Sequence, residues 1–194
     1  MGVFGLTGNF ASGKTTVLQL LKNKGANVFD CDDKIHEYYR DKNSSIYKKI
    51  AAAFPKAIKR GRIQRDILGK EVFFNKSKLS VLEDIVHPVI KQDLLYWIDE
   101  AKKKEGIYVA EVPLLFEKKW DRYFDGAILV LAPVANAIKR IMKDHRLSKQ
   151  EALDRLALYI PIIEKIEKAD FIINNNLGIK ELKKEVNLLW KNLK

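Results

Sequence analysis

The segment that most constrains this chain runs from Gly8 to Thr15. It matches the pattern G-x-x-x-x-G-K-[ST] at every fixed position and reads Gly8-Asn9-Phe10-Ala11-Ser12-Gly13-Lys14-Thr15. In this pattern the glycines let the backbone curl around an anion, and main-chain N–H groups at the start of the following helix face the phosphates. Lys14 is expected to reach the terminal phosphates, and the Thr15 hydroxyl is expected to coordinate Mg²⁺. The segment, together with Thr16, therefore predicts a binding site for a nucleoside triphosphate.

The residues around this loop provide the structural context that the pattern requires. Apolar residues at 3, 4 and 6 predict a short buried strand before the loop, and residues 15–24 have the spacing of an amphipathic helix. Gly25 is a typical residue to end that helix, and residues 26–29 predict a second strand. A strand, a helix and a strand in this order indicate parallel pairing through a crossover helix.

Three more strands are predicted at residues 107–112, 127–131 and 171–173, and helices at 135–143, 148–158 and 179–193. Residues 34–104 have helical spacing without strands, which predicts a helical insertion. A chain of 194 residues is short enough to form a single folding unit. The predicted fold is therefore the α/β fold of P-loop NTPases, with a five-stranded parallel sheet flanked by helices and with two helical excursions.

The chain carries 36 Lys and Arg against 25 Asp and Glu, a net charge of +11 that favours an anionic partner. The basic residues are scattered along helices, whereas a nucleic-acid footprint is more clustered, so we expect no nucleic-acid partner. No apolar run approaches the roughly 20 residues of a membrane span, and no signal peptide is evident. The single cysteine excludes an internal disulfide and fits a reducing compartment, so a cytoplasmic location is expected.

A cluster of acidic residues, Asp30-Cys31-Asp32-Asp33, follows the second predicted strand. The carboxyl ends of parallel strands line the ligand crevice, and strand alternation would turn Asp30 and Asp32 the same way. One carboxylate could accept a proton from an attacking hydroxyl while the other orders water bound to magnesium. Alternatively, Asp32 or Asp33 caps the next helix. We favour the cap for Asp33 and the catalytic role for Asp32.

With these residues considered together, the chain resembles the dephospho-CoA kinase family over nearly its whole length. The Asp30–Asp32 segment stands where the family usually has D-A-D, and Arg140 stands at the opening of its lid. The other segments that carry the resemblance are Gly5-Leu6-Thr7-Gly8, Gly61-Arg62-Ile63-Gln64-Arg65, Val86-His87-Pro88, Val112-Pro113-Leu114-Leu115-Phe116-Glu117 and Ala169-Asp170-Phe171-Ile172-Ile173-Asn174.

The resemblance implies transfer of the γ-phosphoryl group of ATP to the ribose 3′-hydroxyl of dephospho-CoA, the last step of coenzyme A biosynthesis, with Mg²⁺ as cofactor. It implies a nucleotide core at about 1–32, 105–134 and 161–194, a helical acceptor region at about 33–104 and a lid at about 135–160. Asp32 would be the base and would also contact the acceptor. Lys14 and Arg140 would stabilise the charge on the moving phosphoryl group, and Thr15 would hold the metal.

The resemblance also implies an acceptor site and an adenine site. The acceptor site would be lined by Arg65, His87, Pro113, Leu114, Leu115, Phe116 and Glu117, and Asn174 would lie near the adenine. Arg65 could instead pair with a carboxylate, and Phe116 could belong to the core. His87 and Pro88 could instead mark a helix break, and His36 is expected at the surface. The three tryptophans, Trp97, Trp120 and Trp190, are expected to serve packing.

The sequence departs from the family pattern in the loop and in the lid. Asn9 and Ala11 replace glycines that are common in the family. Asp144 stands where a second lid arginine is usual, between Lys143 and Arg146, and Tyr159 replaces a common glutamine. Which of Arg140, Lys143 and Arg146 reaches the phosphoryl group is therefore open.

Three other functions compete with this interpretation. A nucleoside or nucleoside-monophosphate kinase would share the core and the lid. A GTPase switch would need the motif N-K-x-D, and Asn75-Lys76-Ser77-Lys78 fails at its last position. A nucleic-acid-binding module would rest on the net charge alone. The sequence does not indicate an oligomeric state.

Overall fold

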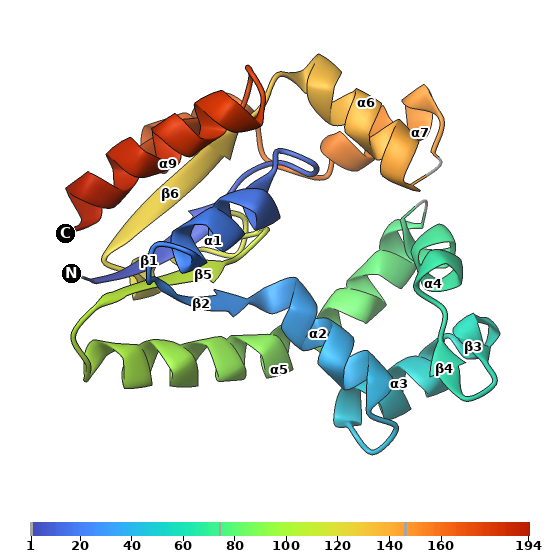
Figure 1. Ribbon diagram of the computed structural model, residues 1–194. Helices are drawn as coiled ribbons and strands as arrows, with labels where there is room; N and C mark the ends of the chain where they lie inside the picture. The colour runs from blue at the N-terminus through green and yellow to red at the C-terminus, as the bar shows by residue number, and fades with distance from the viewer. Residues whose placement is uncertain (1, 74, 146) are drawn as a thin grey trace. The chain divides into compact units, whose positions relative to one another are not determined.

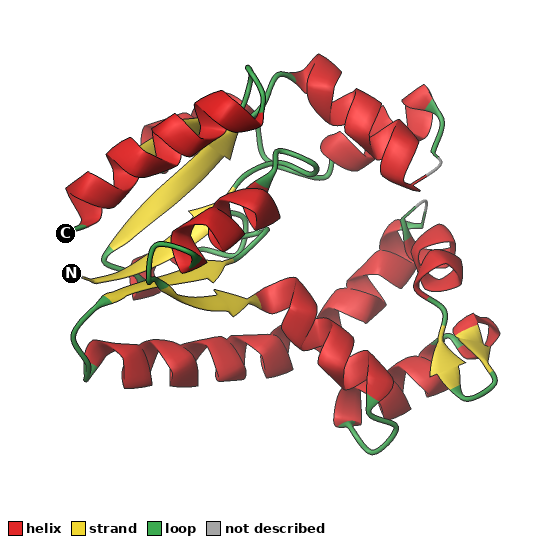
Figure 2. Cartoon of the chain, in the orientation of Figure 1, coloured by secondary structure: helices red, strands yellow, loops and turns green. Residues whose placement is uncertain are grey.

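The computed structural model describes residues 2–73, 75–145 and 147–194, and the chain divides into two compact units. We call residues 1–30 and 97–194 the sheet unit, and residues 31–96 the helical unit. Figures 1 and 2 show a parallel sheet with its helices in the first and a group of helices with one small hairpin in the second. The predicted acceptor region, residues 33–104, contains nearly all of the helical unit.

The sheet unit is built on five strands in the order β2-β5-β1-β6-β7, and every neighbouring pair is parallel. The strands are β1 (Gly2–Thr7), β2 (Asn27–Asp30), β5 (Ile107–Glu111), β6 (Gly126–Leu131) and β7 (Phe171–Asn174). Because β1 lies in the centre, the loop that follows it starts at the middle of the carboxyl edge. The five-stranded parallel sheet predicted from the sequence is confirmed.

The main core of the sheet unit lies between the sheet and two helices, α1 (Lys14–Lys22) and α9 (Ile179–Leu193), which Figure 1 shows side by side. Val17 and Leu21 of α1 pack with Val186 of α9 against Leu6 and Val109 of the central strands, all essentially without exposure. Each buried aliphatic side chain of this kind contributes about 1.5–3 kcal/mol to folding. This packing fixes the start of α1, and therefore the phosphate loop, above the sheet edge.

The rest of the sheet unit consists of the end of α5 (Lys76–Lys102), a short 3₁₀ turn η2 (Asp121–Tyr123) and three helices that follow β6. These helices are α6 (Val134–His145), α7 (Lys149–Leu156) and α8 (Ile162–Lys168), of which the sequence analysis did not identify α8. Trp97 packs against Phe29 and Tyr108, with ring centroids 5.5 and 5.8 Å apart, and Trp120 is buried. The packing role predicted for these two tryptophans is confirmed.

The helical unit contains α2 (Cys31–Arg40), α3 (Ser45–Ala53), the 3₁₀ turn η1 (Pro55–Ala57), α4 (Arg65–Val72) and the first part of α5. Its interior is formed by aliphatic side chains at helical spacing and by Phe54. The Ser44 hydroxyl caps α3 by accepting the Tyr47 N–H at 3.0 Å, and the Tyr38 hydroxyl donates to Asp93 at 2.5 Å. The Asp93 carboxylate raises the pKa of Tyr38 to about 12, so this contact joins α2 and α5 at any ordinary pH.

The helical unit differs from the prediction by containing strands. The strands β3 (Ile58–Lys59) and β4 (Arg62–Ile63), of two residues each, form an antiparallel hairpin in which Ile58 pairs with Ile63. The turn between them, Arg60 and Gly61, has positive φ angles of 51° and 70°, the geometry that two-residue hairpin turns need. Strands of two residues are too short to produce an alternating pattern, and this explains why hydrophobic periodicity missed them.

Three further interpretations of local structure are wrong. Helix α2 begins at Cys31, so strand alternation ends at Asp30 and does not relate it to Asp32. Asp33 is not an N-cap, because it lies with Asp32 inside the first turn, where negative charge is favoured by the helix dipole. Pro88 does not break a helix either, since α5 runs through it without interruption. Cys31 is buried at the junction of β2 and α2.

Among the residues that the structure describes, no helix combines the length and the apolar character that a membrane crossing requires.

Candidate active site

The phosphate loop, residues 8–15, has a backbone that requires glycine at two positions. A side chain at Gly8 would place its Cβ 2.5 Å from the Val130 carbonyl oxygen and 2.6 Å from the Ser12 hydroxyl. Gly13 has φ of 99° at the N-cap of α1, and a Cβ there would overlap the Asn175 amide. Both glycines of the motif are therefore required by close packing as well as by backbone geometry.

Lys14 turns its side chain back over the loop. Its ammonium group donates to the carbonyl oxygens of Gly8 at 3.1 Å and Asn9 at 3.3 Å, and the residue is only 7% exposed. Helix α1 begins at the same residue, so the main-chain N–H groups of the first helical turn and a buried cation converge there. This convergence is the arrangement that binds the phosphates of a nucleotide.

Ala11 occupies the left-handed region with φ of 59°, where glycine is favoured. In the family that the chain resembles, glycine is common at this position. The structure shows the physical reason, because a Cβ in this conformation costs about 1–2 kcal/mol. The Ala11 carbonyl oxygen accepts a hydrogen bond at 3.0 Å from Nη1 of Arg140, which α6 carries. Of the two other lid cations considered, Lys143 is exposed and Arg146 lies outside the described residues.

A carboxylate stands beside the predicted metal ligand. The Thr15 hydroxyl donates to Oε1 of Glu111 at 3.4 Å, and Glu111, at the carboxyl end of β5, is 2% exposed. Oxygen atoms from a hydroxyl and a carboxylate suit Mg²⁺, which usually takes one or two protein ligands together with phosphate and water. Within residues 2–73, 75–145 and 147–194 no set of three potential His, Cys, Asp or Glu ligands gathers at any one place. The sequence analysis missed Glu111, although its place at the end of a central strand was a usable signal.

A second arginine from the predicted lid region contacts the loop, and it was not identified from the sequence. Arg155 of α7 places its guanidinium carbon 4.9 Å from the ring centroid of Phe10, inside the phosphate loop. Burial lowers the pKa of Arg155, while Tyr159 and Glu151 act in the opposite direction. No local pattern separates Arg155 from the other basic residues of the lid, so only its packing on Phe10 identifies it.

The segment after β5, predicted to line the acceptor site, is largely buried in the sheet unit. Leu115 and Phe116 are 0% and 3% exposed and belong to the core, while Leu114 is half-buried. The Pro113 carbonyl oxygen accepts the Thr7 hydroxyl at 3.2 Å. Glu117 forms an ion pair with Lys165 at 2.8 Å. An acceptor role for these residues stays a prediction.

Asn175 reaches the phosphate loop, whereas the prediction concerned Asn174. The side-chain amide of Asn175 donates to the Ser12 carbonyl oxygen at 2.7 Å in a buried contact. The main-chain N–H of Asn175 donates to the Leu131 carbonyl oxygen. Asn174 is exposed and its N–H donates to Glu185 at 3.1 Å. Asn175 thus supports the loop, and the adenine contact of Asn174 stays a prediction.

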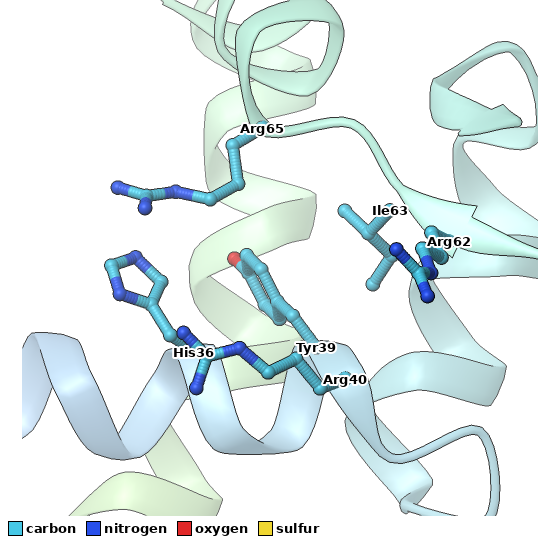
Figure 3. A pocket seen from close by; sticks show the side chains of 6 residues that line it. All are labelled: His36, Tyr39, Arg40, Arg62, Ile63 and Arg65. Atoms are coloured by element: carbon cyan, nitrogen blue, oxygen red, sulfur yellow. The ribbon is translucent and has the colours of Figure 1, made fainter.

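A pocket of about 450 Å³ opens in the helical unit. Figure 3 shows that α2 supplies His36, Tyr39 and Arg40, that β4 supplies Arg62 and Ile63, and that Arg65 begins α4. The guanidinium of Arg65 and the imidazole of His36 extend to the same side, with the Tyr39 hydroxyl turned towards them. His36, expected at the surface, is therefore a half-buried pocket residue instead.

The electrostatics of this pocket favour an anion. Burial lowers the pKa of His36, as does Arg65, whereas Asp32 and Asp33 raise it. Burial also raises the pKa of Tyr39 to about 12. Arg65 acts to lower this pKa, and Asp32 acts to raise it. Around neutral pH His36 and Tyr39 are therefore uncharged, and the three arginines give the pocket its positive charge. Asp32, exposed in the first turn of α2, is close enough to act on both groups.

His87 lies elsewhere on the helical unit, on α5. Its Nδ1 is 3.9 Å from a carboxylate oxygen of Glu83, one helical turn earlier, and the imidazole is about one-quarter exposed. The structure thus places Asp32 and Arg65 in one neighbourhood and does not include His87 in the lining of the pocket.

Comparison with known proteins identifies relatives across the whole chain. The family model for dephospho-CoA kinase matches residues 2–181. The dephospho-CoA kinase of Latilactobacillus sakei is 35% identical over 184 residues, which cover 94% of this chain and 91% of that protein. The Bartonella quintana dephospho-CoA kinase is 34% identical over 194 residues, covering 100% and 98%.

Solved structures agree with these matches. A crystal structure from Thermus thermophilus has a TM-score of 0.77 at 32% identity, covering 99% of this chain and 97% of that one. The dephospho-CoA kinase of Campylobacter jejuni has a TM-score of 0.67 at 27% identity with the same coverage. A shikimate kinase from Acinetobacter baumannii has a TM-score of 0.56 at 19% identity, covering 99% and 94%, and shows the shared P-loop fold alone.

Proposed function

This chain belongs to the dephospho-CoA kinase family, and from that membership we propose which of its residues carry out each part of the reaction. The protein is a kinase that uses ATP to phosphorylate dephospho-CoA in the biosynthesis of coenzyme A. The oxygen of the ribose 3′-hydroxyl attacks the γ-phosphorus of ATP, the bond from that phosphorus to ADP breaks, and the hydroxyl proton passes to a carboxylate.

The phosphate loop binds the triphosphate of ATP. The main-chain N–H groups at the start of α1 and the buried ammonium of Lys14 face the phosphates, while Gly8 and Gly13 leave room for the loop to close around them. Lys14 also balances the charge that moves to the leaving oxygen. This convergence of a buried lysine with a helix N-terminus is the observation that carries the proposed function.

Thr15 and Glu111 are the residues that would hold Mg²⁺, because their oxygens lie together beside the loop. The metal, when bound, neutralises charge on the phosphate oxygens. Arg140 and Arg155 stabilise the transferred phosphoryl group from the lid side, since both contact residues of the loop. Much of the catalysis comes from positioning and charge, because phosphoryl transfer needs little covalent help from the protein.

Asp32 accepts the proton of the attacking hydroxyl. Support comes from its match to the family motif and from its place near the arginine-lined pocket. Arg65, with Arg40 and Arg62, binds the anionic part of the acceptor, because planar guanidinium groups suit phosphate oxygens. His87 and residues 113–117 remain candidates for its uncharged part, and Asn174 remains one for the adenine of ATP.

The experiment that tests this function compares acceptors side by side. Release of ADP is followed with ATP and Mg²⁺ against dephospho-CoA, adenosine, AMP and CMP. We expect rapid turnover with dephospho-CoA only, and a product that carries its new phosphate at the ribose 3′ position. Comparable turnover with AMP or CMP would instead establish a nucleoside-monophosphate kinase.

We also propose that the protein works in the cytoplasm and that its positive charge serves its two anionic substrates. The buried lone cysteine fits a reducing compartment. The scattered basic residues favour small anions over nucleic acid. Steep salt-dependent binding to DNA or RNA would contradict the second part.

A further inference from the structure

One lysine of the sheet unit is completely buried. Lys165 lies in α8, its side chain is 0% exposed, and its ammonium group is 2.8 Å from Oε1 of Glu117. Burial lowers the pKa of Lys165, whereas the Glu117 carboxylate favours the charged ammonium. A buried ion pair is costly to form, and apolar residues of similar size often stabilise a fold as well or better. Its presence therefore needs a reason other than stability.

The ion pair joins two segments that are distant in the sequence. Glu117 belongs to the segment after β5, while Lys165 belongs to the helix that follows the lid. The same carboxylate oxygen accepts the N–H of Ile160 at 3.3 Å, in the connection between α7 and α8. Glu117 thus contacts both the last part of this short connection and the helix that follows it.

Tyr159 extends the contact towards the lid. The Lys165 ammonium lies 4.8 Å from the centroid of the Tyr159 ring, a cation–π distance. From Tyr159 the chain turns directly into α7, because the Tyr159 N–H donates to Leu156 and the Leu158 N–H donates to Arg155. Arg155 is therefore one helical turn away from a residue that packs on the buried ammonium.

Arg155 in turn contacts the phosphate loop through Phe10. A continuous series of contacts thus leads from Glu117 through Lys165 and Tyr159 to Arg155 and the loop. Small errors in the position of a catalytic group are expensive, because a displacement of about 1 Å can cost on the order of 10²-fold in rate.

We propose that Lys165 is a positioning residue for phosphoryl transfer: its ion pair with Glu117, and the packing of Tyr159 on its ammonium, hold the end of α7 so that Arg155 lies over the phosphate loop. This inference rests on the proposed function, in which Arg155 acts on the transferred group. It adds a residue that no motif predicts, in the helix that follows α7.

The test begins with Lys165→Met, which keeps the length of the side chain and removes its charge. The matched control is Lys168→Met, an exposed lysine one turn later in the same helix. We expect kcat with ATP and dephospho-CoA to fall about 10- to 100-fold in the first variant and to stay within about 2-fold in the control. Lys165→Arg, which keeps the charge, is expected to restore part of the loss.

A double-mutant cycle with Arg155→Ala separates positioning from simple stability. If Lys165 acts through Arg155, Lys165→Met lowers kcat by less than about 2-fold in the Arg155→Ala background. A purely structural effect would give the same fold-loss in both backgrounds and would overturn the proposal. If Lys165→Met does not fold, the double variant Lys165→Met/Glu117→Met takes its place, because it leaves no unpaired buried charge. Its kcat is then compared with and without Arg155→Ala in the same way.

A second readout does not depend on turnover. With ATP bound, amide hydrogen exchange in residues 149–160 is expected to be at least about 10-fold faster in Lys165→Met than in the wild type or in Lys168→Met. Unchanged exchange would overturn the inference. Absence of dephospho-CoA phosphorylation by the wild-type protein would instead contradict the proposed function and would leave the exchange result to decide the positioning role.

Discussion

The sheet unit and the helical unit both present cations to phosphate, but they do so by different physical means. In the sheet unit, Lys14 is buried, main-chain N–H groups at the start of α1 add positive potential, and Arg140 and Arg155 contact the loop. In the helical unit the charge belongs to Arg40, Arg62 and Arg65, whose side chains are exposed around an open pocket. Charge in the first site is held by the backbone and by side chains that contact the loop, whereas charge in the second belongs to exposed side chains.

This difference predicts different behaviour towards salt and mutation. Buried charges are screened little, whereas exposed charges lose most of their interaction beyond a Debye length of about 8 Å at physiological ionic strength. We therefore expect KM for dephospho-CoA to rise with salt more steeply than KM for ATP. Five substitutions test the comparison more directly.

The largest effect is expected from Asp32→Asn, which removes the proposed base while keeping the shape of the side chain. Turnover should fall about 10²- to 10⁴-fold, because proton transfer loses its acceptor. Affinity for ATP should be kept, since the triphosphate site belongs to the sheet unit. Steady-state kinetics and calorimetric ATP binding measure the two quantities, and Asp33→Asn, in the same helical turn, is the control. Near wild-type turnover would remove Asp32 from this role.

Arg140→Ala is expected to slow single-turnover phosphoryl transfer by up to about 10³-fold, because an arginine that stabilises the transition state contributes on that scale. Lys139→Ala, its exposed neighbour on α6, serves as the control. Rapid-quench measurement of the γ-phosphoryl group gives the rate. An unchanged rate would transfer the function to Arg155 or Lys143 and would leave the contact with Ala11 as a purely structural one.

Arg65→Gln is expected to raise KM for dephospho-CoA about 10- to 100-fold, the loss that follows from removing a charge-assisted hydrogen bond of about 1.5–3 kcal/mol. KM for ATP should not change. Lys70→Gln, an exposed residue near the end of the same helix, is the control. A rise in KM for ATP alone would mean that the pocket does not receive the acceptor, and the comparison between the two sites would fail.

Ala11→Gly is expected to stabilise the sheet unit by up to about 1 kcal/mol. The φ angle of 59° costs alanine about 1–2 kcal/mol, and glycine would remove this strain. Glycine also gives the unfolded chain more conformational freedom, which offsets part of the stabilisation. Ala53→Gly, at the exposed end of α3, should destabilise instead. Urea unfolding measures both. A less stable Ala11→Gly variant would show that the positive φ is not strained in this loop.

The smallest effect is expected from His36→Gln. Because burial and Arg65 lower the pKa of His36 in the folded protein, the unfolded chain takes up its proton first as pH falls below 6.5. The free energy of unfolding should therefore fall with acidification, by much less than the limit of about 1.4 kcal/mol per pH unit for one proton. The variant should show a shallower fall in urea unfolding between pH 6.5 and 5. Equal slopes would indicate that His36 titrates as an exposed residue.

The sequence predicted the sheet unit better than the helical unit for a physical reason. The phosphate loop and the five strands depend on local backbone requirements and on buried apolar runs, both of which are visible along the chain, whereas the order of the strands in the sheet was not predicted. Arg155 and Glu111 become functional candidates only through packing with Phe10 and Thr15, which come from distant segments. Such contacts leave no periodic pattern in the sequence.

In the helical unit the prediction of helices was confirmed for the long segments, but not for the hairpin at Arg60 and Gly61. The pocket was missed because its lining comes from α2, β4 and α4. Arg65 was identified through the family motif, whereas His36 was assigned to the surface because a single histidine carries no information about the residues that fold around it.

The position of Cys31 gives the enzyme an intrinsic chemical probe of motion. The thiol is the only one in the chain, it is buried, and it directly precedes Asp32 at the junction of β2 and α2. A thiol reagent can react only when this junction opens to solvent, so the rate of alkylation measures how often the backbone that carries the proposed base leaves its folded position. Without any introduced label, a single mass measurement over time would show whether binding of each substrate slows or speeds that opening.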